Sequence, residues 1–289
     1  MRVTELRMMQ LSSRALERAR HDVAKTGDAI SSGRRVERPS DDPLAWAEGQ
    51  RAAARTVTLE GQRRALVSSF EDLQATDSAL DGMTQALQRM YEIAIQQANG
   101  TYSAADRNAA ATEVGQLGEL VLAAGNARAS DGSHLFAGSQ TAAAPFTANG
   151  TFVGDDAPHT LSIDGTNPEI RLSGQLLTAA NGVDVMTLAT DLSNALVNGD
   201  QAGITTAVTR LRTSLEQVAG VRAEVGSRMV VVETLDRTTE DLALSSEIRR
   251  ERALDTDLFE SASAWTRALS VLEAARSYAD RLHDILRKR

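Results

Sequence analysis

Long stretches of the chain carry apolar residues at alternating steps of three and four, the spacing that places side chains on one face of an α-helix. The pattern predicts long helices over 43–98, about 104–127 and about 204–244, and a shorter one over 183–198. Gly100 separates the first two. Similar patterns at both ends of the chain predict two further helices.

The cleanest apolar seam lies close to the C-terminus. Between Leu258 and Leu272 the apolar residues recur at steps of four, three, four and three, which is a heptad pattern. Such a stripe is also typical of an intramolecular core face, but an Ala-rich seam buries little area per turn, so we favour burial against other subunits. The predicted subunit-interface residues are Val3, Leu6, Leu258, Trp265, Leu269, Leu272, Leu282 and Leu286.

The pattern changes over 136–177, where short β-prone runs lie between turn-forming pairs. The runs are 151–153, 160–163 and 170–172. Asn149-Gly150 and Asp164-Gly165 favour tight hairpin turns. We therefore predict a mainly α protein with a small β-rich insertion domain between its helices.

Composition argues against an enzyme. The 289 residues suffice for about two domains, but they include only ten aromatic residues against 46 Ala, which disfavours a deep cofactor pocket. With no Cys, disulfides, Cys-bound metals and thiol nucleophiles are excluded. The four His residues lack metal-ligand spacing and are predicted on the surface, and nucleotide-binding and nucleophile-elbow motifs are absent from the sequence. We expect no catalytic residue, no metal and no cofactor.

Charge disfavours nucleic acid as a partner. The net charge is −8, with +4 over residues 1–64, −14 over 65–248 and +2 over 249–289. Basic and acidic residues are interleaved and form no basic stripe of the kind that binds nucleic acid. The sequence also contains no apolar run long enough to span a membrane, and its opening residues do not resemble a secretory signal.

Two adjacent carboxylates, Asp41 and Asp42, invite an acid–base or cation-binding interpretation. Helix capping explains them better, because Asp42 directly precedes Pro43 and Pro is favoured at the first position of a helix. Two Asn-Gly-Thr triplets, beginning at Asn99 and Asn149, match glycosylation acceptors, but we interpret both as turns.

The segment around these carboxylates resembles a known family. Ser31-Ser32-Gly33-Arg34-Arg35-Val36, followed by Arg38-Pro39-Ser40-Asp41-Asp42-Pro43-Leu44-Ala45, is similar to the N-terminal signature of the flagellin superfamily. Pro-Ser-Asp-Asp-Pro favours the hook–filament junction family over the flagellins. Supporting matches are Leu135-Phe136-Ala137-Gly138, Val225-Gly226-Ser227-Arg228-Met229 and Asp255-Thr256-Asp257. The motif-loop residues are Ser32, Gly33, Arg34, Pro39, Ser40, Asp41, Asp42 and Pro43.

The resemblance implies an architecture in layers. Residues 1–42 with 250–289 would form a terminal coiled-coil layer, 43–133 with 186–249 a long antiparallel helical rod, and 134–185 the β-rich outer domain. It further implies a structural ring that links the hook side to the filament and templates filament assembly. The implied partners are other copies of the chain, the hook-side junction protein, flagellin and an export chaperone at the C-terminal helix, with neither nucleic acid nor membrane. The implied location is the extracellular flagellum, reached by type III export without a cleavable signal.

Two alternatives stay open at this point. A divergent flagellin would build the filament itself and would form long filaments from pure protein. A cytoplasmic coiled-coil adaptor would use the β-rich insertion to bind a ligand and would be found only inside cells.

Overall fold

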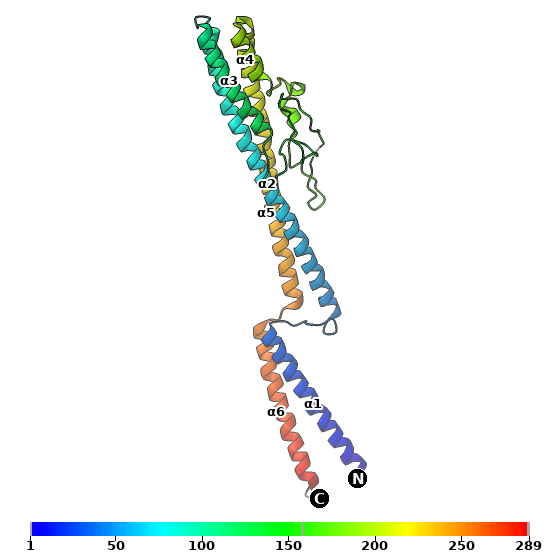
Figure 1. Cartoon of the computed structure of the whole chain (residues 1–289). Helices are drawn as coiled ribbons and strands as arrows, with labels where there is room; N and C mark the ends of the chain where they lie inside the picture. The colour runs from blue at the N-terminus through cyan, green and yellow to red at the C-terminus, as the bar shows by residue number, and fades with distance from the viewer. Residues whose placement is uncertain (1, 158, 288–289) are drawn as a thin grey trace. The chain divides into compact units, whose positions relative to one another are not determined.

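The computed structural model describes residues 2–157 and 159–287, which are mainly helical (Figure 1). The α-helices are α1 (Arg2–Ser32), α2 (Pro43–Ala98), α3 (Ala104–Gly125), α4 (Leu188–Asn198), α5 (Gln201–Leu254) and α6 (Leu258–Arg287). Two short 3-10 helices, η1 (Gly174–Leu177) and η2 (Ala179–Asn181), lie between α3 and α4 in the sequence. The predicted helices are present: α2 has the predicted bounds and α5 extends beyond 204–244 at both ends, whereas α4 begins at Leu188, five residues later than predicted.

The chain divides into two compact units. The terminal unit comprises Met1–Leu59 and Asp241–Arg289, and the central unit comprises Glu60–Glu240. Because α2 and α5 cross this division, each unit contains part of both helices. Within the terminal unit α1 lies against α6, and within the central unit α3 lies against α4.

The core of the central unit includes a heptad seam along α2 and α5. Its most buried residues lie seven positions apart and are at most 1% exposed: Leu66, Leu73, Leu80 and Leu87 in α2, and Leu211, Val218, Val225 and Val232 in α5. This spacing keeps one face of each helix turned toward the core. Arg222, which interrupts the apolar pattern of α5, forms ion pairs of 2.9 Å with Asp77 and 2.8 Å with Asp81 of α2.

The predicted β-rich insertion domain is not confirmed. The described residues of 126–187 contain no strand and instead make five isolated antiparallel bridges. The turns are as predicted: Ile163 and Thr166 exchange two backbone hydrogen bonds of 2.8 Å across Asp164-Gly165, whose φ angles are 45° and 87°. The same hairpin makes a second bridge, between Thr160 and Glu169, but the two bridges are not adjacent and no continuous ladder forms.

Aromatic rings and close glycine contacts hold this segment together. Phe136 and Phe146 are at most 2% exposed, and the ring centroids of Phe146 and Phe152 lie 5.4 Å apart. Gly138, with φ of 65°, approaches the backbone so closely that an added Cβ would lie 2.2 Å from the carbonyl oxygen of Asp155. The Leu135-Phe136-Ala137-Gly138 motif therefore supplies core residues and a turn that requires glycine.

One surface prediction is wrong. His134 is 3% exposed, whereas His21, His159 and His283 lie on the surface as predicted. The His134 Nδ1 lies 3.0 Å from the carbonyl oxygen of Asn126, to which it donates a hydrogen bond. The residue is buried because this bond and a backbone bridge to Arg128 bring it against the end of α3, a contact that helical and strand periodicity cannot reveal.

Two arginines attach segment 126–187 to the long helices. Arg171 Nη2 donates hydrogen bonds of 2.7 Å to Asp72 Oδ2 on α2 and 3.0 Å to Ser133 Oγ. Arg228 of α5 binds Glu169 at 3.0 Å, and it lies in the Val225-Gly226-Ser227-Arg228-Met229 motif. The Arg171 and Asp72 side chains are only 10% and 11% exposed, so each neutralises a charge that is largely removed from water.

We predict that Arg171→Met destabilises the protein, because the Asp72 carboxylate is then left in place without its ion-pair partner. The expected loss in the free energy of unfolding is about 3 kcal/mol, measured by denaturant titration. Adding Asp72→Asn to the Arg171→Met variant should restore most of the lost free energy of unfolding, since the uncompensated charge is removed. A single variant as stable as the wild type would contradict this role for the pair.

Candidate functional site

The motif loop begins where a glycine ends α1. Gly33 has φ of 69°, the left-handed conformation that terminates helices, and it directly follows Ser32. Ser32 Oγ donates a 2.9 Å hydrogen bond back to the carbonyl oxygen of Asp28. The Gly33 carbonyl oxygen accepts a 3.0 Å hydrogen bond from the backbone N–H of Thr256, in the connection between α5 and α6.

The segment that follows α1 lies beside the end of α5 and the start of the connection to α6, an arrangement that we call the loop crossing (residues 33–36 with 253–256). Arg34 and Asp255 form an antiparallel bridge. The N–H groups of Arg35 and Val36 both donate to the carbonyl oxygen of Leu254, at 2.8 and 3.1 Å. The loop crossing thus satisfies polar groups that the ends of α1 and α5 leave without helical partners.

A small apolar cluster supports the loop crossing. Val36 is 1% exposed and packs with Ala253 and Leu254, while Trp46 lies against the same cluster. Gly49 of α2 permits this approach, because an added Cβ would lie 2.5 Å from Cγ of Leu254. The bulky Trp46 side chain is therefore accommodated because it packs against this cluster, beside the small residue Gly49.

The two motif carboxylates cap backbone turns. Asp41 Oδ2 accepts hydrogen bonds from the N–H groups of Arg38 and Glu37, at 2.9 and 3.2 Å, and these bonds hold the pKa of Asp41 below its ordinary value. Asp42 Oδ1 accepts a 3.0 Å bond from the Ala45 N–H, which is the main cause of its lowered pKa. The predicted helix start at Asp42-Pro43 is confirmed.

The remaining motif residues have simpler roles. Pro39 and Ser40 lie exposed in the turn before α2, and Arg34 is also exposed. Asp257, from the supporting Asp255-Thr256-Asp257 match, caps α6: its Oδ1 accepts bonds of 2.8 Å from the Phe259 N–H and 3.1 Å from the Glu260 N–H. The family motifs thus set where α2 and α6 begin.

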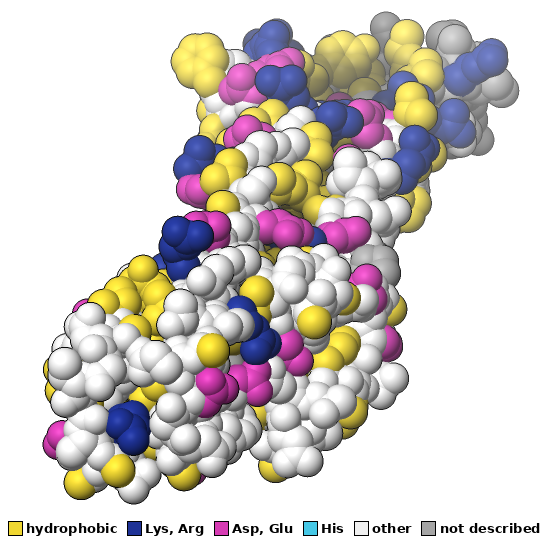
Figure 2. All heavy atoms as spheres, turned by 90° about the horizontal axis from the view of Figure 1, so that it is seen from above, with side chains coloured by type: hydrophobic (Ala, Val, Ile, Leu, Met, Phe, Trp, Pro, Cys, Tyr) yellow, Lys and Arg dark blue, Asp and Glu magenta, His cyan; other side chains and the backbone are white. Residues whose placement is uncertain are grey.

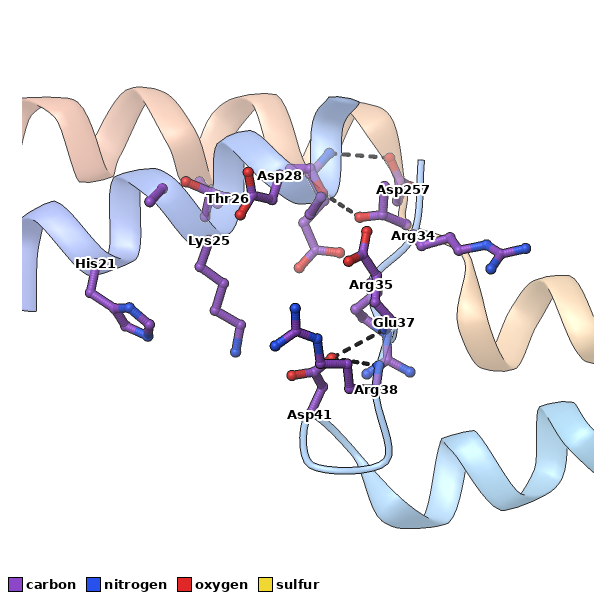
Figure 3. Close-up of a pocket in the computed structure, with 16 residues that line it drawn as sticks. His21, Lys25, Thr26, Asp28, Arg34, Arg35, Glu37, Arg38, Asp41 and Asp257 are labelled. Carbon is purple, nitrogen blue, oxygen red and sulfur yellow. Dashed lines mark hydrogen bonds between the residues drawn. The ribbon is translucent and has the colours of Figure 1, made fainter. Parts of the chain in front are cut away.

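A cleft of about 520 Å³ lies beside the loop crossing in the terminal unit (Figure 3). Its charged lining residues come from α1, the motif loop and the start of α6, with His21 beside them, and are Lys25, Asp28, Arg34, Arg35, Glu37, Arg38, Asp41, Asp257 and Glu260. Charges of both signs line it, a composition that suits contact with a charged protein segment better than an apolar ligand. Within the part of the chain that the structure describes, no acidic or His cluster is able to hold a metal ion.

The predicted interface residues differ in exposure. Leu272 is 6% exposed, and Leu269 and Leu282 are half-buried, whereas Leu258 and Trp265 are 60% and 38% exposed. Part of the predicted stripe is therefore covered within the chain itself. The structure does not describe the side chains of Val3, Leu6 and Leu286, so the prediction at these three positions stays a prediction.

Sequence reasoning missed several exposed apolar residues of α6. Phe259 is 85% exposed, and Val271 and Tyr278 are 58% and 59% exposed. Val271 and Tyr278 lie seven positions apart, so they form a second stripe beside the predicted one. That spacing was present in the sequence and could have revealed the second stripe.

On the face in Figure 2, Lys and Arg side chains alternate with Asp and Glu and form no continuous basic stripe. Among the described residues, none of the helices is sufficiently long and apolar to span a membrane.

Comparison with known proteins extends the motif resemblance to almost the whole chain. Residues 4–141 match the bacterial flagellin N-terminal helical region. Flagellar hook-associated protein 3 of Salmonella typhimurium is 26% identical over 95% of both chains, and that of Escherichia coli matches equally well. The chain is similar to flagellar hook-associated protein 3. A filament core protein of Borreliella burgdorferi is 34% identical, but over only 33% of this chain and 29% of its own.

Solved structures show the same fold. The hook-associated protein-3 of Legionella pneumophila superposes with a TM-score of 0.61 at 13% identity, covering 70% of this chain and 98% of that one. FlgL of Bacillus cereus gives a TM-score of 0.59 at 22% identity, covering 71% and 98%. The similarity to hook-associated protein 3 therefore holds in both sequence and fold.

The lowered pKa values of Asp41 and Asp42 predict that the motif loop loses stability in acid. A carboxylate whose folded-state pKa is depressed stabilises the fold above its unfolded-state pKa of about 3.9, and this contribution is lost as the pH falls through the folded-state pKa. The melting temperature of the wild type should therefore exceed that of the double variant Asp41→Asn, Asp42→Asn at neutral pH. This difference, followed by circular dichroism, should shrink below about pH 4; a difference that grows in acid would contradict the assignment.

Proposed function

We propose that this chain is a structural protein of the bacterial flagellum that joins the hook side to the filament, and that it performs no enzymatic step. Its similarity to hook-associated protein 3 over 95% of both chains supports this function. The flagellar filament protein of Borreliella burgdorferi aligns with only about a third of the chain, which favours a junction protein over a divergent flagellin.

The observation that carries this proposal is the apolar surface of the terminal helices. Leu11 of α1 is 62% exposed, and Leu258, Phe259 and Val271 of α6 are 58% to 85% exposed. Water-exposed apolar side chains of this size, gathered on two paired helices, mark a surface that is buried on association. We therefore propose that neighbouring copies cover these faces in a ring.

The proposed ring has three layers. Residues 1–42 with 250–289 form its coiled-coil layer, 43–133 with 186–249 its rod, and 134–185 its outer part. The hook-side junction protein and flagellin are the proposed neighbours on its two sides. An export chaperone is proposed to cover α6 until the chain leaves the cell by type III export to reach the extracellular flagellum.

Deleting the gene is expected to leave bare hooks on cells, with flagellin shed into the medium, because the filament then has no base on which to grow. Electron microscopy of the deletion strain, together with measurement of flagellin in the medium, checks this. Restoring the gene should restore attached filaments. Filaments still attached in the deletion strain would contradict the junction function, and recovery of the protein only inside wild-type cells would favour a cytoplasmic adaptor.

The double variant Val271→Glu, Tyr278→Glu should abolish motility while leaving the isolated protein folded. Both residues are more than half exposed, so each substitution should change the free energy of unfolding by only about 0.5 kcal/mol, whereas two charges buried in a subunit interface would block assembly. Swimming and the melting temperature are measured. The matched control is Val197→Glu on α4, equally exposed in the central unit, which should remain motile; normal swimming of the double variant would contradict the proposed interface.

A further inference from the structure

The chain contains four Asn-Gly pairs, at Asn99, Asn149, Asn181 and Asn198. In such a pair the Gly backbone nitrogen can attack the Asn side-chain Cγ. A bond between this nitrogen and Cγ forms, the Cγ–Nδ2 bond breaks and ammonia leaves. Water then opens the cyclic imide to aspartate or isoaspartate. The reaction needs a Gly N–H and an Asn amide that are free to approach each other, so the structure distinguishes four pairs that are identical in sequence.

Asn149 is held by the hairpin turn that contains it. The Gly150 N–H donates a 2.9 Å hydrogen bond to the Thr147 carbonyl oxygen. Gly150 also packs closely on Met186, since an added Cβ would lie 2.9 Å from the Cβ of that residue. The attacking nitrogen must break a good hydrogen bond and leave a packed position before it can react.

Asn181 is held through its own side chain. Its Nδ2 donates a 3.0 Å hydrogen bond to the carbonyl oxygen of Gln175, which keeps the amide in place at the end of η2. The neighbouring Gly182 is also confined, because an added Cβ would lie 2.7 Å from Oε1 of Gln217. The Gly182 N–H bond to the Ala179 carbonyl oxygen is itself long, at 3.4 Å, so this pair is restricted by the bonded Asn181 amide and by the packing of Gly182.

Asn198 is held by helix geometry. It is the last residue of α4, and the Gly199 N–H is directed at two carbonyl oxygens, those of Ala195 and Leu196. The distance to the Leu196 oxygen is 3.2 Å. Helical backbone angles at Asn198 keep its side chain away from the following nitrogen.

Asn99 is the least restrained of the four. It is exposed and lies just after the end of α2, and the described residues show no hydrogen bond to its side chain. The Gly100 N–H makes a bond of 3.4 Å to the Gln97 carbonyl oxygen, longer than an ordinary N–H···O hydrogen bond. Both reacting groups are therefore available in the folded protein.

We propose that Asn99 is a site of spontaneous deamidation in the native protein, in preference to the other three Asn-Gly pairs. The product places a carboxylate at the C-terminal end of α2, where the helix dipole already disfavours negative charge. The neighbouring Ala98 carbonyl oxygen accepts a hydrogen bond from Gln201 Nε2, which connects the α2–α3 turn to the start of α5. Isoaspartate adds a backbone atom beside this contact and weakens it.

The test is peptide mapping by mass spectrometry of the full-length protein, sampled over time at mildly alkaline pH. Having to break one backbone hydrogen bond first slows a reaction by up to about tenfold, so Asn99 should react roughly tenfold faster than Asn149. In guanidinium chloride the hydrogen bonds are lost, and the four rates should converge. The variant Asn99→Gln should lose the fast product while the other three sites react unchanged.

Two outcomes would overturn the proposal. In the first, Asn149, Asn181 or Asn198 reacts as fast as Asn99 in the folded protein. In the second, the folded protein shows no deamidation at Asn99 on the time scale of the denatured sample. Neither outcome bears on the junction function, which rests on different residues.

Discussion

The backbone hydrogen bonds of the loop crossing are the constraint on which the terminal unit depends. Arg35 and Val36 share the Leu254 carbonyl oxygen, and Thr256 binds that of Gly33. These bonds join two segments that lie far apart in the sequence, and they set where α1 ends and α6 begins. Without them, α1 and α6 would have only their own poor packing to hold them in register.

That packing differs sharply from the packing in the central unit. The seam of α2 and α5 buries Leu and Val at successive heptads, each contributing about 1.5–3 kcal/mol. In α1, by contrast, the only described residues that are at most 9% exposed are Ser12 and Ala19, and α6 adds Leu272. Gly27 faces the Trp265 ring across a space that a methyl group would fill, since an added Cβ would lie at an ordinary contact distance of 3.6 Å from Nε1 of that ring. Because α1 and α6 bury so few side chains against each other, neighbouring subunits could supply the additional burial.

Local patterns made much of this fold predictable. Apolar spacing at steps of three and four, with Gly100 beyond its end, predicted the extent of α2, and Asp42-Pro43 predicted its capped start. The loop crossing could not be predicted, because the pairing of Val36 with Leu254 is a long-range contact between an irregular segment and the last residue of α5. The segment 126–187 shows the same limit: its turns were predicted, but whether short runs join into strands depends on packing around Phe136 and Phe146.

On this account, the loop crossing is formed in the monomer, whereas α1 and α6 gain most of their stability from assembly. Amide hydrogen exchange tests this claim most directly, measured both in the isolated protein and in detached hook–filament preparations. We predict slow exchange at Arg35, Val36 and Thr256 in both samples. Exchange in α1 and α6 should be fast in the monomer and slow in the assembly. Protection of α1 and α6 in the monomer equal to that of the α2 and α5 seam would contradict this dependence on assembly.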